Sequence, residues 1–584
     1  MARRISSGAR ARRWMAGTAA AVLALGLIVP AELSAREGSL DAVPSDSFVG
    51  NYLAGRFAAQ QRDKESASIF LGAALSQNPE DVGLLDQAFV AALAAGDFDA
   101  AVANAKALVK HDSENRLARI TIAADALRGR QYARVAKILD GGFENPLAAI
   151  AGTFLDAWAS VGAGKAADAA AIVEKMDDLD NADVRRIKDY VLGMIAEYSG
   201  DAEAALAAYE RAFEVASGNV RVVEAVARAA ARTGNFDRAR EVAKAYNDRA
   251  PDHALIIQAL AAVEAGRVPP FPATAPQAGA AEAIYTLGSA LGREASDEMA
   301  VMFYQLALLM QGDAPLPLLG MAAYYDAVAD YDKAIETIDR IPPGAAQHVG
   351  SQISKARILD KMDRTGEALE ILDALAIAAP GRDVFVARAS ILHGEKRYLD
   401  SADAYTSAIA AVGEVRDADW YLYYYRGMVR ERAKQWPLAE ADFKRALELN
   451  PEQPNVLNYL GYSWIDQGLN LDEALKLVKR AVELRPKDGD ITDSLGWAYY
   501  RLGRYEEAVT TLERAVELRP EEPIILDHLG DAYWRVGRRF EARFQWQHAL
   551  DRKPEDAELV GIIEQKVKDG LPEEPAQKAA KASD

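Results

Sequence analysis

Residues 526–554 read LDHLGDAYWRVGRRFEARFQWQHALDRKP, and the order of small, aromatic and helix-breaking residues in this stretch decides the fold. Gly530 is followed twelve residues later by Ala542, and Pro554 closes the stretch. Small residues are needed where two helices cross closely, and aromatic residues at helical spacing fill the space beside the crossing. Proline ends a helix because it lacks an N–H and clashes with the preceding turn. The stretch therefore predicts a pair of packed helices.

The same order of residues recurs three times upstream of this stretch. The four glycines are 34, 35 and 34 residues apart, and each is followed by two alanines and a proline. One helical hairpin cannot bury its own apolar face, so hairpins of this kind stack and share a continuous core. The repeated positions are Gly427, Ala439, Ala446 and Pro451; Gly461, Ala474, Ala481 and Pro486; Gly496, Ala508, Ala515 and Pro520; and Gly530, Ala542, Ala549 and Pro554.

The period and the pattern Leu-x2-Leu-Gly-x2-Tyr, followed by Ala-x3-Trp and Pro, resemble the tetratricopeptide repeat. The resemblance implies an all-α fold, a right-handed superhelical solenoid of tetratricopeptide helix-turn-helix repeats. We count about fourteen units between residues 48 and 556, and the unit boundaries are least regular in 116–185. The clearest units are 420–453, 454–488, 489–522 and 523–556.

A proline-rich segment divides the predicted repeats into two arrays. Val268 to Pro276 contains four prolines and cannot be helical, so we expect it to run extended and exposed. We assign an N-terminal, divergent array to 36–266, the linker to 267–280 and the C-terminal array to 281–556. The sequence leaves open whether the linker is a hinge or an insertion in a continuous stack.

The two ends of the chain differ from the repeats. Residues 1–35 contain five arginines and then an uncharged, mostly apolar run from Trp14 to Val29, which predicts a signal peptide. This run is shorter than the roughly 20 residues that span a bilayer, so cleavage is favoured over a retained anchor. Residues 557–569 have the amphipathic pattern of a capping helix, and 570–584 have the composition of a disordered tail.

Composition argues against several classes of function. The chain of 584 residues has a formal net charge of −19, so nucleic acid is not an expected partner. It has no cysteine, which excludes disulfides, thiolate metal sites and cysteine nucleophiles. Its six histidines are scattered, and the common catalytic and phosphate-binding motifs are missing from the sequence. We therefore predict no catalytic residues, no cofactor and no metal.

In tetratricopeptide proteins the first helix of each unit lines the concave face, and the resemblance implies which residues lie there. Aromatic, amide and carboxylate groups at repeat spacing have the composition of a protein-binding face. A column of Asn and Asp residues can accept backbone N–H groups of an extended peptide, or it can bond neighbouring helices of the protein itself. The predicted partner-binding residues are Tyr421, Tyr424, Tyr425, Asn458, Tyr462, Asp493, Trp497, Tyr500, Arg501, Asp527, Asp531, Trp534 and Arg535.

Three consecutive units carry a more specific resemblance. Residues 458–464 read NYLGYSW, 493–497 read DSLGW and 527–534 read DHLGDAYW. These units resemble a family of exported Gram-negative tetratricopeptide proteins that includes the lipoprotein adaptor of a periplasmic C-terminal processing protease. The resemblance implies an adaptor that holds the protease and presents substrates such as cell-wall hydrolases. The chain has no lipid-attachment cysteine, so outer-membrane tethering does not follow from it.

The predicted function is a non-enzymatic scaffold that binds proteins or peptides in the periplasm or cell envelope of a Gram-negative bacterium. The leading hypothesis is the protease adaptor. One alternative is a scaffold for envelope or outer-membrane assembly. Another, from a different class, is an enzyme whose site lies in the divergent segment 116–185. The sequence does not predict the oligomeric state or the identity of the partner.

Overall fold

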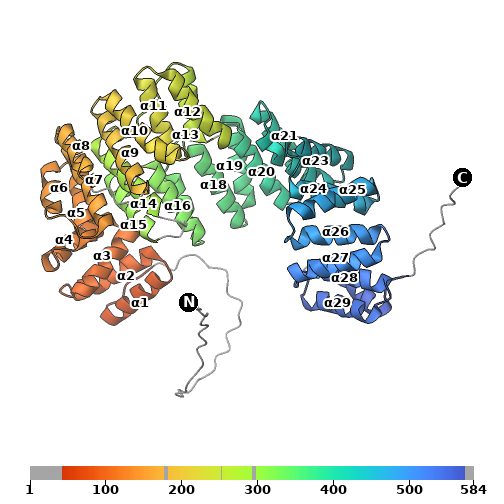
Figure 1. Ribbon diagram of the computed structural model, residues 1–584. Helices are drawn as coiled ribbons and strands as arrows, with labels where there is room; N and C mark the ends of the chain where they lie inside the picture. Colours follow the sequence, from red (N-terminus) through yellow and green to blue (C-terminus); the bar gives the residue numbers. More distant parts are fainter. Residues whose placement is uncertain (1–41, 177–181, 252, 292–297, 555, 573–584) are drawn as a thin grey trace, which may run out of the picture. The chain divides into compact units, whose positions relative to one another are not determined.

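The chain forms an all-α solenoid of helical hairpins in the part that the computed structural model describes (Figure 1). No strand is found among the described residues. The predicted signal peptide lies outside them, as does the predicted tail beyond residue 572. The described residues are 42–176, 182–251, 253–291, 298–554 and 556–572.

The chain divides into two compact units, with the boundary after Ala95. The first unit contains three helices that share a core of small and aliphatic side chains, including Leu71, Ala74 and Leu84. Its helices are α1 (Phe48–Gln60), α2 (Lys64–Gln77) and α3 (Val82–Ala95).

The second unit begins at Gly96 and contains the remaining helices. Before the proline-rich segment these are α4 (Phe98–His111), α5 (Arg116–Arg128), α6 (Tyr132–Leu139), α7 (Pro146–Gly162), α8 (Ala166–Glu174), α9 (Ala182–Tyr198), α10 (Ala202–Ala216), α11 (Val220–Arg232), α12 (Phe236–Arg249) and α13 (Ala254–Glu264). After it come α14 (Pro276–Leu291), α15 (Glu298–Met310), α16 (Pro315–Ala327), α17 (Tyr331–Asp339), α18 (His348–Lys361), α19 (Thr365–Ala378), α20 (Arg382–Gly394), α21 (Tyr398–Val412), the short 3₁₀ helix η1 (Asp417–Asp419), α22 (Trp420–Arg432), α23 (Trp436–Leu449), α24 (Pro454–Gln467), α25 (Leu471–Leu484), α26 (Gly489–Arg501), α27 (Tyr505–Leu518), α28 (Pro523–Arg535), α29 (Arg539–Asp551) and α30 (Ala557–Asp569).

Helices of the second unit pair in chain order. Each odd-numbered helix from α5 to α11 packs against the next helix, and from α14 to α28 each even-numbered helix does so. The first helices of neighbouring hairpins also touch, as in α24 with α26 and α26 with α28. We call the surface formed by α5, α7, α9 and α11 the N-terminal first-helix face, and that formed by α22, α24, α26 and α28 the C-terminal first-helix face.

The repeated glycines lie where the two helices of a hairpin cross. A Cβ atom on Gly530 would lie 2.4 Å from Nε1 of Trp546, and one on Gly496 would lie 2.5 Å from Cγ of Leu512. Real Cβ contacts are not this short, so the crossing requires glycine. Trp546 is fully buried on the facing helix. The predicted pairing of small residues with large ones at the crossings is therefore confirmed.

The proline-rich segment runs without helical structure from 265 to 275, and α14 already begins at Pro276, inside the range predicted as linker. The sequence predicts an exposed segment, but in the structure only part of it is exposed. Pro269 and Ala273 are buried, and the ring of Phe271 lies under the guanidinium of the fully buried Arg228, 5.2 Å from ring centroid to Cζ. Alternate residues of an extended segment point to opposite sides, so one side packs on α11 while the other faces solvent.

Past this segment the chain returns to the N-terminal first-helix face, where α14 packs against α7 and α9 (Figure 1). A Cβ atom on Gly279 would lie 2.2 Å from the indole ring of Trp158, so glycine lets α14 lie directly on α7. Glu282 accepts hydrogen bonds from the Tyr190 hydroxyl (3.1 Å) and from Nε of Arg221 (2.8 Å). The α7 and α9 part of this first-helix face is therefore covered by a helix of the same chain.

Candidate partner-binding site

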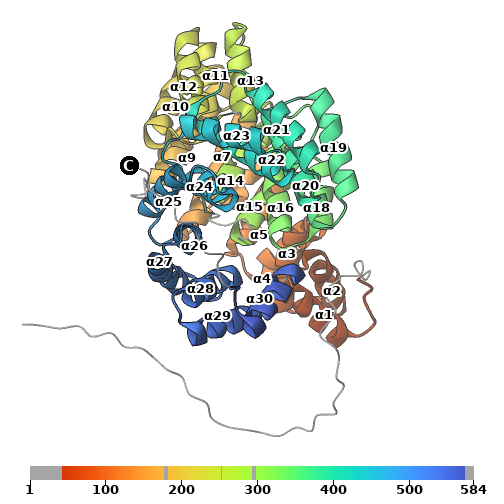
Figure 2. The ribbon, with the colours of Figure 1, turned by 90° about the vertical axis from the view of Figure 1, so that its right-hand side faces the viewer.

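All thirteen predicted partner-binding residues lie on α22, α24, α26 and α28. These helices follow one another as the first helices of four consecutive hairpins (Figure 2). They belong to one continuous core that extends from Ala439 to Ile563. Because one core holds the four helices in register, their side chains are positioned as a set.

An aromatic cluster forms the α22 end of the C-terminal first-helix face. The ring of Tyr424 contacts those of Trp420, Tyr425 and Tyr459, with centroids 5.3–6.1 Å apart. Burial raises the pKa of Tyr424 to about 12. Tyr425 stacks on Tyr405 and remains 44% exposed. It is the most exposed aromatic residue of the predicted set.

On α24 the predicted residues are half-buried. Asn458 has a buried Oδ1 for which no hydrogen-bond partner is found within the described structure. Burial, together with the charges of Asp466 and Asp493, raises the pKa of Tyr462 to about 12. Arg501 of α26 reaches back to Asp466, with Nη1 3.0 Å from Oδ1 and Nη2 donating to the main-chain carbonyl. A polar bridge therefore joins α24 to α26 beside Tyr462.

A stack of rings joins α26 to α28. The indole of Trp497 lies between the rings of Tyr500 and His528, with centroid distances of 4.7 and 4.1 Å and interplanar angles of 10° and 16°. His528 Nδ1 lies 2.9 Å from Oδ1 and 3.0 Å from Oδ2 of Asp493. Burial disfavours the charged imidazole, but the carboxylates of Asp493, Asp527 and Asp531 together outweigh it and raise the pKa of His528. The stack is thereby fixed by a buried ion pair.

The two acidic residues of α28 are bonded to the capping helix. Nζ of Lys566 lies 2.8 Å from Oδ2 of Asp527 and 2.9 Å from Asp531. Asp531 also accepts the Nε1–H of Trp546 at 3.0 Å. Burial and the neighbouring Asp527 raise the pKa of Asp531 to about 6. Both carboxylates are buried, with exposures of 5%.

The last two predicted residues contact the chain beyond α30. Trp534 Nε1 donates to the carbonyl of Leu571 at 3.2 Å, and Nη1 of Arg535 donates to the carbonyl of Pro572 at 2.8 Å. Nε of Arg535 also donates to the Tyr500 hydroxyl at 3.3 Å. This hydrogen bond joins the ring stack on α26 to Arg535 of α28.

Twelve of the thirteen predicted residues fall into two groups, and the half-buried Asn458 belongs to neither. Asp493, Asp527 and Asp531 are buried and bond other helices of the protein, which is the second of the two roles that the sequence left open. The aromatic residues and arginines remain at least partly accessible, and their contact with a partner stays a prediction. Sequence reasoning did not select His528 and Lys566, the two cations that pair with these acids.

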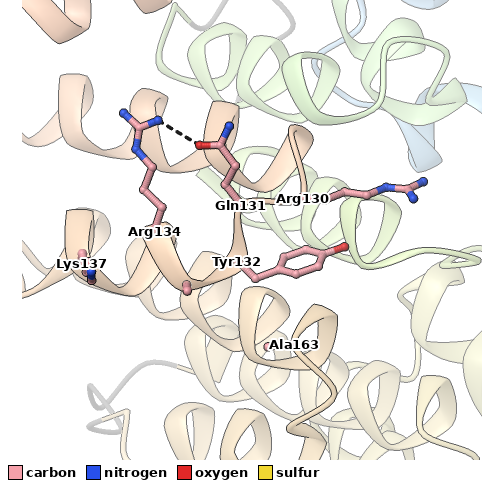
Figure 3. A pocket seen from close by; sticks show the side chains of 7 residues that line it. Arg130, Gln131, Tyr132, Arg134, Lys137 and Ala163 are labelled. Atoms are coloured by element: carbon pink, nitrogen blue, oxygen red, sulfur yellow. Dashed lines mark hydrogen bonds between the residues drawn. The ribbon is translucent and has the colours of Figure 1, made fainter.

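Two shallow surface pockets are lined by none of the predicted partner-binding residues. One, of about 570 Å³, is lined by residues of the divergent segment between Arg130 and Ala163. Figure 3 shows that the side chains of Arg130, Arg134 and Lys137 point in different directions, and Arg134 Nη1 bonds Oε1 of Gln131 at 2.9 Å. The other pocket, of about 530 Å³, lies at the turn around Pro486. The three cations of the first pocket do not converge on a common point, which gives the enzyme alternative in 116–185 no support.

Within the ranges that the structure describes, no group of three or more His, Cys, Asp or Glu side chains is arranged to hold a metal ion. No helix in those ranges has the length and apolar character needed to cross a bilayer.

Comparison with known families identifies the repeats. Two models described as tetratricopeptide repeat match residues 198–263 and 424–489, and one described as TPR repeat matches 496–537. Together with the helical hairpins, these matches define the class: the chain is a tetratricopeptide-repeat protein. No curated protein gives a significant match.

Many solved structures resemble parts of the chain. A tetratricopeptide repeat protein from Parabacteroides merdae shares 16% identity and a TM-score of 0.35, covering 43% of this chain and 96% of that one. TTC0263 from Thermus thermophilus shares 20% identity, with a TM-score of 0.29, and covers 32% of this chain and 99% of its own. YrrB, described as a TPR protein with an unusual peptide-binding site, shares 21% identity and a TM-score of 0.24 over 38% of this chain and 95% of its own.

Proposed function

We propose that this protein is an exported adaptor that binds other proteins through its C-terminal first-helix face. A tetratricopeptide scaffold suits protein or peptide binding. The finer proposal is that the scaffold works in the periplasm or cell envelope, holds a C-terminal processing protease and presents substrates such as cell-wall hydrolases. It rests on the resemblance of residues 420–556 to the exported adaptor family and on the signal-like residues 1–35.

One observation carries the choice of surface: α14 covers the α7 and α9 part of the N-terminal first-helix face, whereas several aromatic side chains of the C-terminal first-helix face remain partly exposed. On the N-terminal face, α14 packs against α7 and α9, and Gly279 lies on Trp158. On the C-terminal face, Tyr425 is 44% exposed, and Tyr462 and Trp497 are half-buried. Large aromatic side chains held rigidly at a surface are typical of the residues that dominate binding energy.

The proposal is tested by affinity purification of the tagged full-length chain from envelope extracts of its own host. We expect a processing protease and at least one cell-wall hydrolase to be recovered together. Tyr425→Ala and Trp497→Ala should each reduce recovery about tenfold or more, since truncation of an aromatic anchor costs about 2 kcal/mol. The matched control is Phe540→Ala, because Phe540 is 89% exposed on the second helix α29 and outside the proposed face. Circular dichroism checks that helicity is unchanged.

Three outcomes would contradict parts of this proposal. If neither a protease nor a hydrolase is recovered, the adaptor role is wrong. If envelope-assembly components are recovered instead, the alternative of an assembly scaffold replaces it. If recovery falls in Phe540→Ala but not in Tyr425→Ala or Trp497→Ala, the partner binds the opposite side of the array.

A further inference from the structure

The chain turns back onto its own predicted binding residues immediately after α30. Gly570 ends this helix with φ 76° and ψ −175°, a backbone conformation that residues other than glycine rarely adopt. A Cβ atom on Gly570 would lie 2.1 Å from Cη2 and Cζ2 of Trp534. Glycine is therefore required both for the turn and for the close approach of the main chain to the indole ring.

The segment that follows Gly570 is held through its main chain. Trp534 Nε1 donates to the Leu571 carbonyl at 3.2 Å, and Arg535 Nη1 donates to the Pro572 carbonyl at 2.8 Å. Main-chain carbonyl groups are present in any extended peptide, so this pair of donors does not depend on the side chains of the bound segment. The donor pair has the chemistry of a site for extended polypeptide.

A charge contact places the segment on this site. Lys566 lies one turn of helix before Gly570, and its ammonium group lies between the carboxylates of Asp527 and Asp531. The donors are also continuous with the proposed partner surface, because Nε of Arg535 donates to the Tyr500 hydroxyl, and Tyr500 stacks on Trp497. A partner that extends along this surface past Tyr500 therefore meets the chain's own segment.

We propose that Trp534 and Arg535 form a binding site for an extended polypeptide segment, recognised through its main-chain carbonyls, and that the chain's own residues 570–572 occupy this site in the free protein. A tethered segment of this kind acts at a high effective concentration, so it competes with any segment offered by a second molecule. The partner must displace residues 570–572 to use the whole face. The identity of that partner rests on the proposed function, whereas the site itself does not.

The experiment uses the full-length chain and a labelled peptide with the sequence of residues 566–576, KVKDGLPEEPA. Gly570→Ala should open the site, since the added Cβ cannot lie against Trp534. We expect the peptide to bind this variant about tenfold or more tightly than the unchanged protein, in which the site is already filled. Oxidative labelling of Trp534, read by mass spectrometry, should rise in the same variant.

The matched control is Gly561→Ala in the same helix, where a Cβ atom meets open space. It should leave both peptide binding and Trp534 labelling as in the unchanged protein. Adding Arg535→Gln to Gly570→Ala should abolish peptide binding. A chain that ends at Asp569 provides a second way to open the site, and it should behave as Gly570→Ala does.

The proposal is wrong if the peptide binds equally to the unchanged protein and to both opened variants. It is also wrong if the peptide binds to neither opened variant. Unchanged Trp534 labelling in both opened variants contradicts it as well. No partner protein takes part in this experiment. Its failure therefore leaves the proposed adaptor function standing, and a failed purification of the protease leaves this site standing.

Discussion

His528 of α28 and Asp493 of α26 form a buried ion pair across two neighbouring repeats, with Nδ1 2.9 Å from Oδ1. The two residues are 8% and 7% exposed, and the ring of Trp497 stacks on the imidazole. Asp527 and Asp531 add their negative charges to the same surroundings. The interface between the last two full repeats therefore contains a buried histidine whose pKa is raised above its ordinary value by the carboxylates around it.

This pair predicts a dependence of stability on pH. Burial opposes the charge of His528, but Asp493 and the other two carboxylates raise its pKa above the ordinary value of 6.5. Since the pKa is higher in the folded state, the stabilisation is fully present below pH 6.5 and is lost as the pH rises through the raised pKa. We expect His528→Gln, which does not titrate, to be about 1 kcal/mol less stable at pH 6 and to differ less at pH 9. Urea unfolding at both pH values measures this.

The control for the pH prediction is His393→Gln, because His393 is exposed on α20. Its stability difference from the unchanged protein should stay within about 0.5 kcal/mol at both pH values. If the His528→Gln difference grows between pH 6 and pH 9, the sign of the argument is wrong.

Because Gly530 lies at a helix crossing, we predict that even the smallest side chain at this position lowers the stability of the protein. In Gly530→Ala the new Cβ would lie 2.4 Å from Nε1 of the fully buried Trp546, so α28 and α29 must move apart. We expect a loss of about 1–3 kcal/mol in the free energy of unfolding, the usual cost of overpacking. Gly561→Ala makes the same chemical change in a helix with open space and should be neutral or stabilising. Hydrogen exchange in residues 523–551 locates the effect.

The fold could be predicted from the sequence because its determinants are local and repeated. Gly496 meets Leu512, and Gly530 meets Trp546, at the same positions of their respective repeats. A stacked array buries one unit against the next, so a pattern 34 residues long determines the architecture. The return of α14 to α7 could not be predicted in this way. It depends on the contact between Gly279 and Trp158, which are far apart in the sequence and occur once.

The helices of the candidate site could be predicted, but the bonding of its polar residues could not. Repeat register placed Asp493 and Asp527 on first helices, as the structure has them. Whether such carboxylates face a partner or another helix depends on which cations lie opposite. Those cations are His528, one repeat further on, and Lys566, on a helix outside the repeat pattern. The repeat pattern places His528 on a first helix but does not say which carboxylate it meets, and it contains no information about Lys566, which lies outside it.

The contact of Gly279 with Trp158 predicts how α14 is held on the N-terminal first-helix face. In Gly279→Ala the added Cβ would lie 2.2 Å from an indole ring that is fully buried and has little room to move. We expect α14 to shift from α7 and residues 265–275 to become more accessible to proteases, with cleavage there severalfold faster. Gly350→Ala is the control, since a Cβ atom at that position of α18 meets open space. Equal cleavage rates in the two variants would show that α14 is not held by this contact.

We predict that Lys566 contributes much of the stability with which the capping helix α30 is attached. Its ammonium group neutralises two carboxylates, Asp527 and Asp531, that are each 5% exposed. Burial disfavours the charged lysine, but the two carboxylates outweigh it and raise the pKa of Lys566, so it stays charged. Lys566→Met leaves both acids buried without the cation that bonds them, and we expect a loss of about 3 kcal/mol, which is the usual cost of breaking a buried ion pair. The exposed Lys568→Met in the same helix should change stability by less than about 0.5 kcal/mol.

A double-mutant cycle separates the ion pair from the packing of the lysine side chain. If the loss comes from unpaired acids, Asp527→Asn should restore part of the stability of Lys566→Met, because one buried charge is then removed. If the loss comes from packing, the two substitutions should add. Hydrogen exchange of α30 reports the same difference locally. Faster exchange in Lys566→Met that slows again in the double variant would assign the attachment of α30 to charge, whereas unchanged exchange would mean that the apolar contacts of Ile563 and Val567 hold the helix alone.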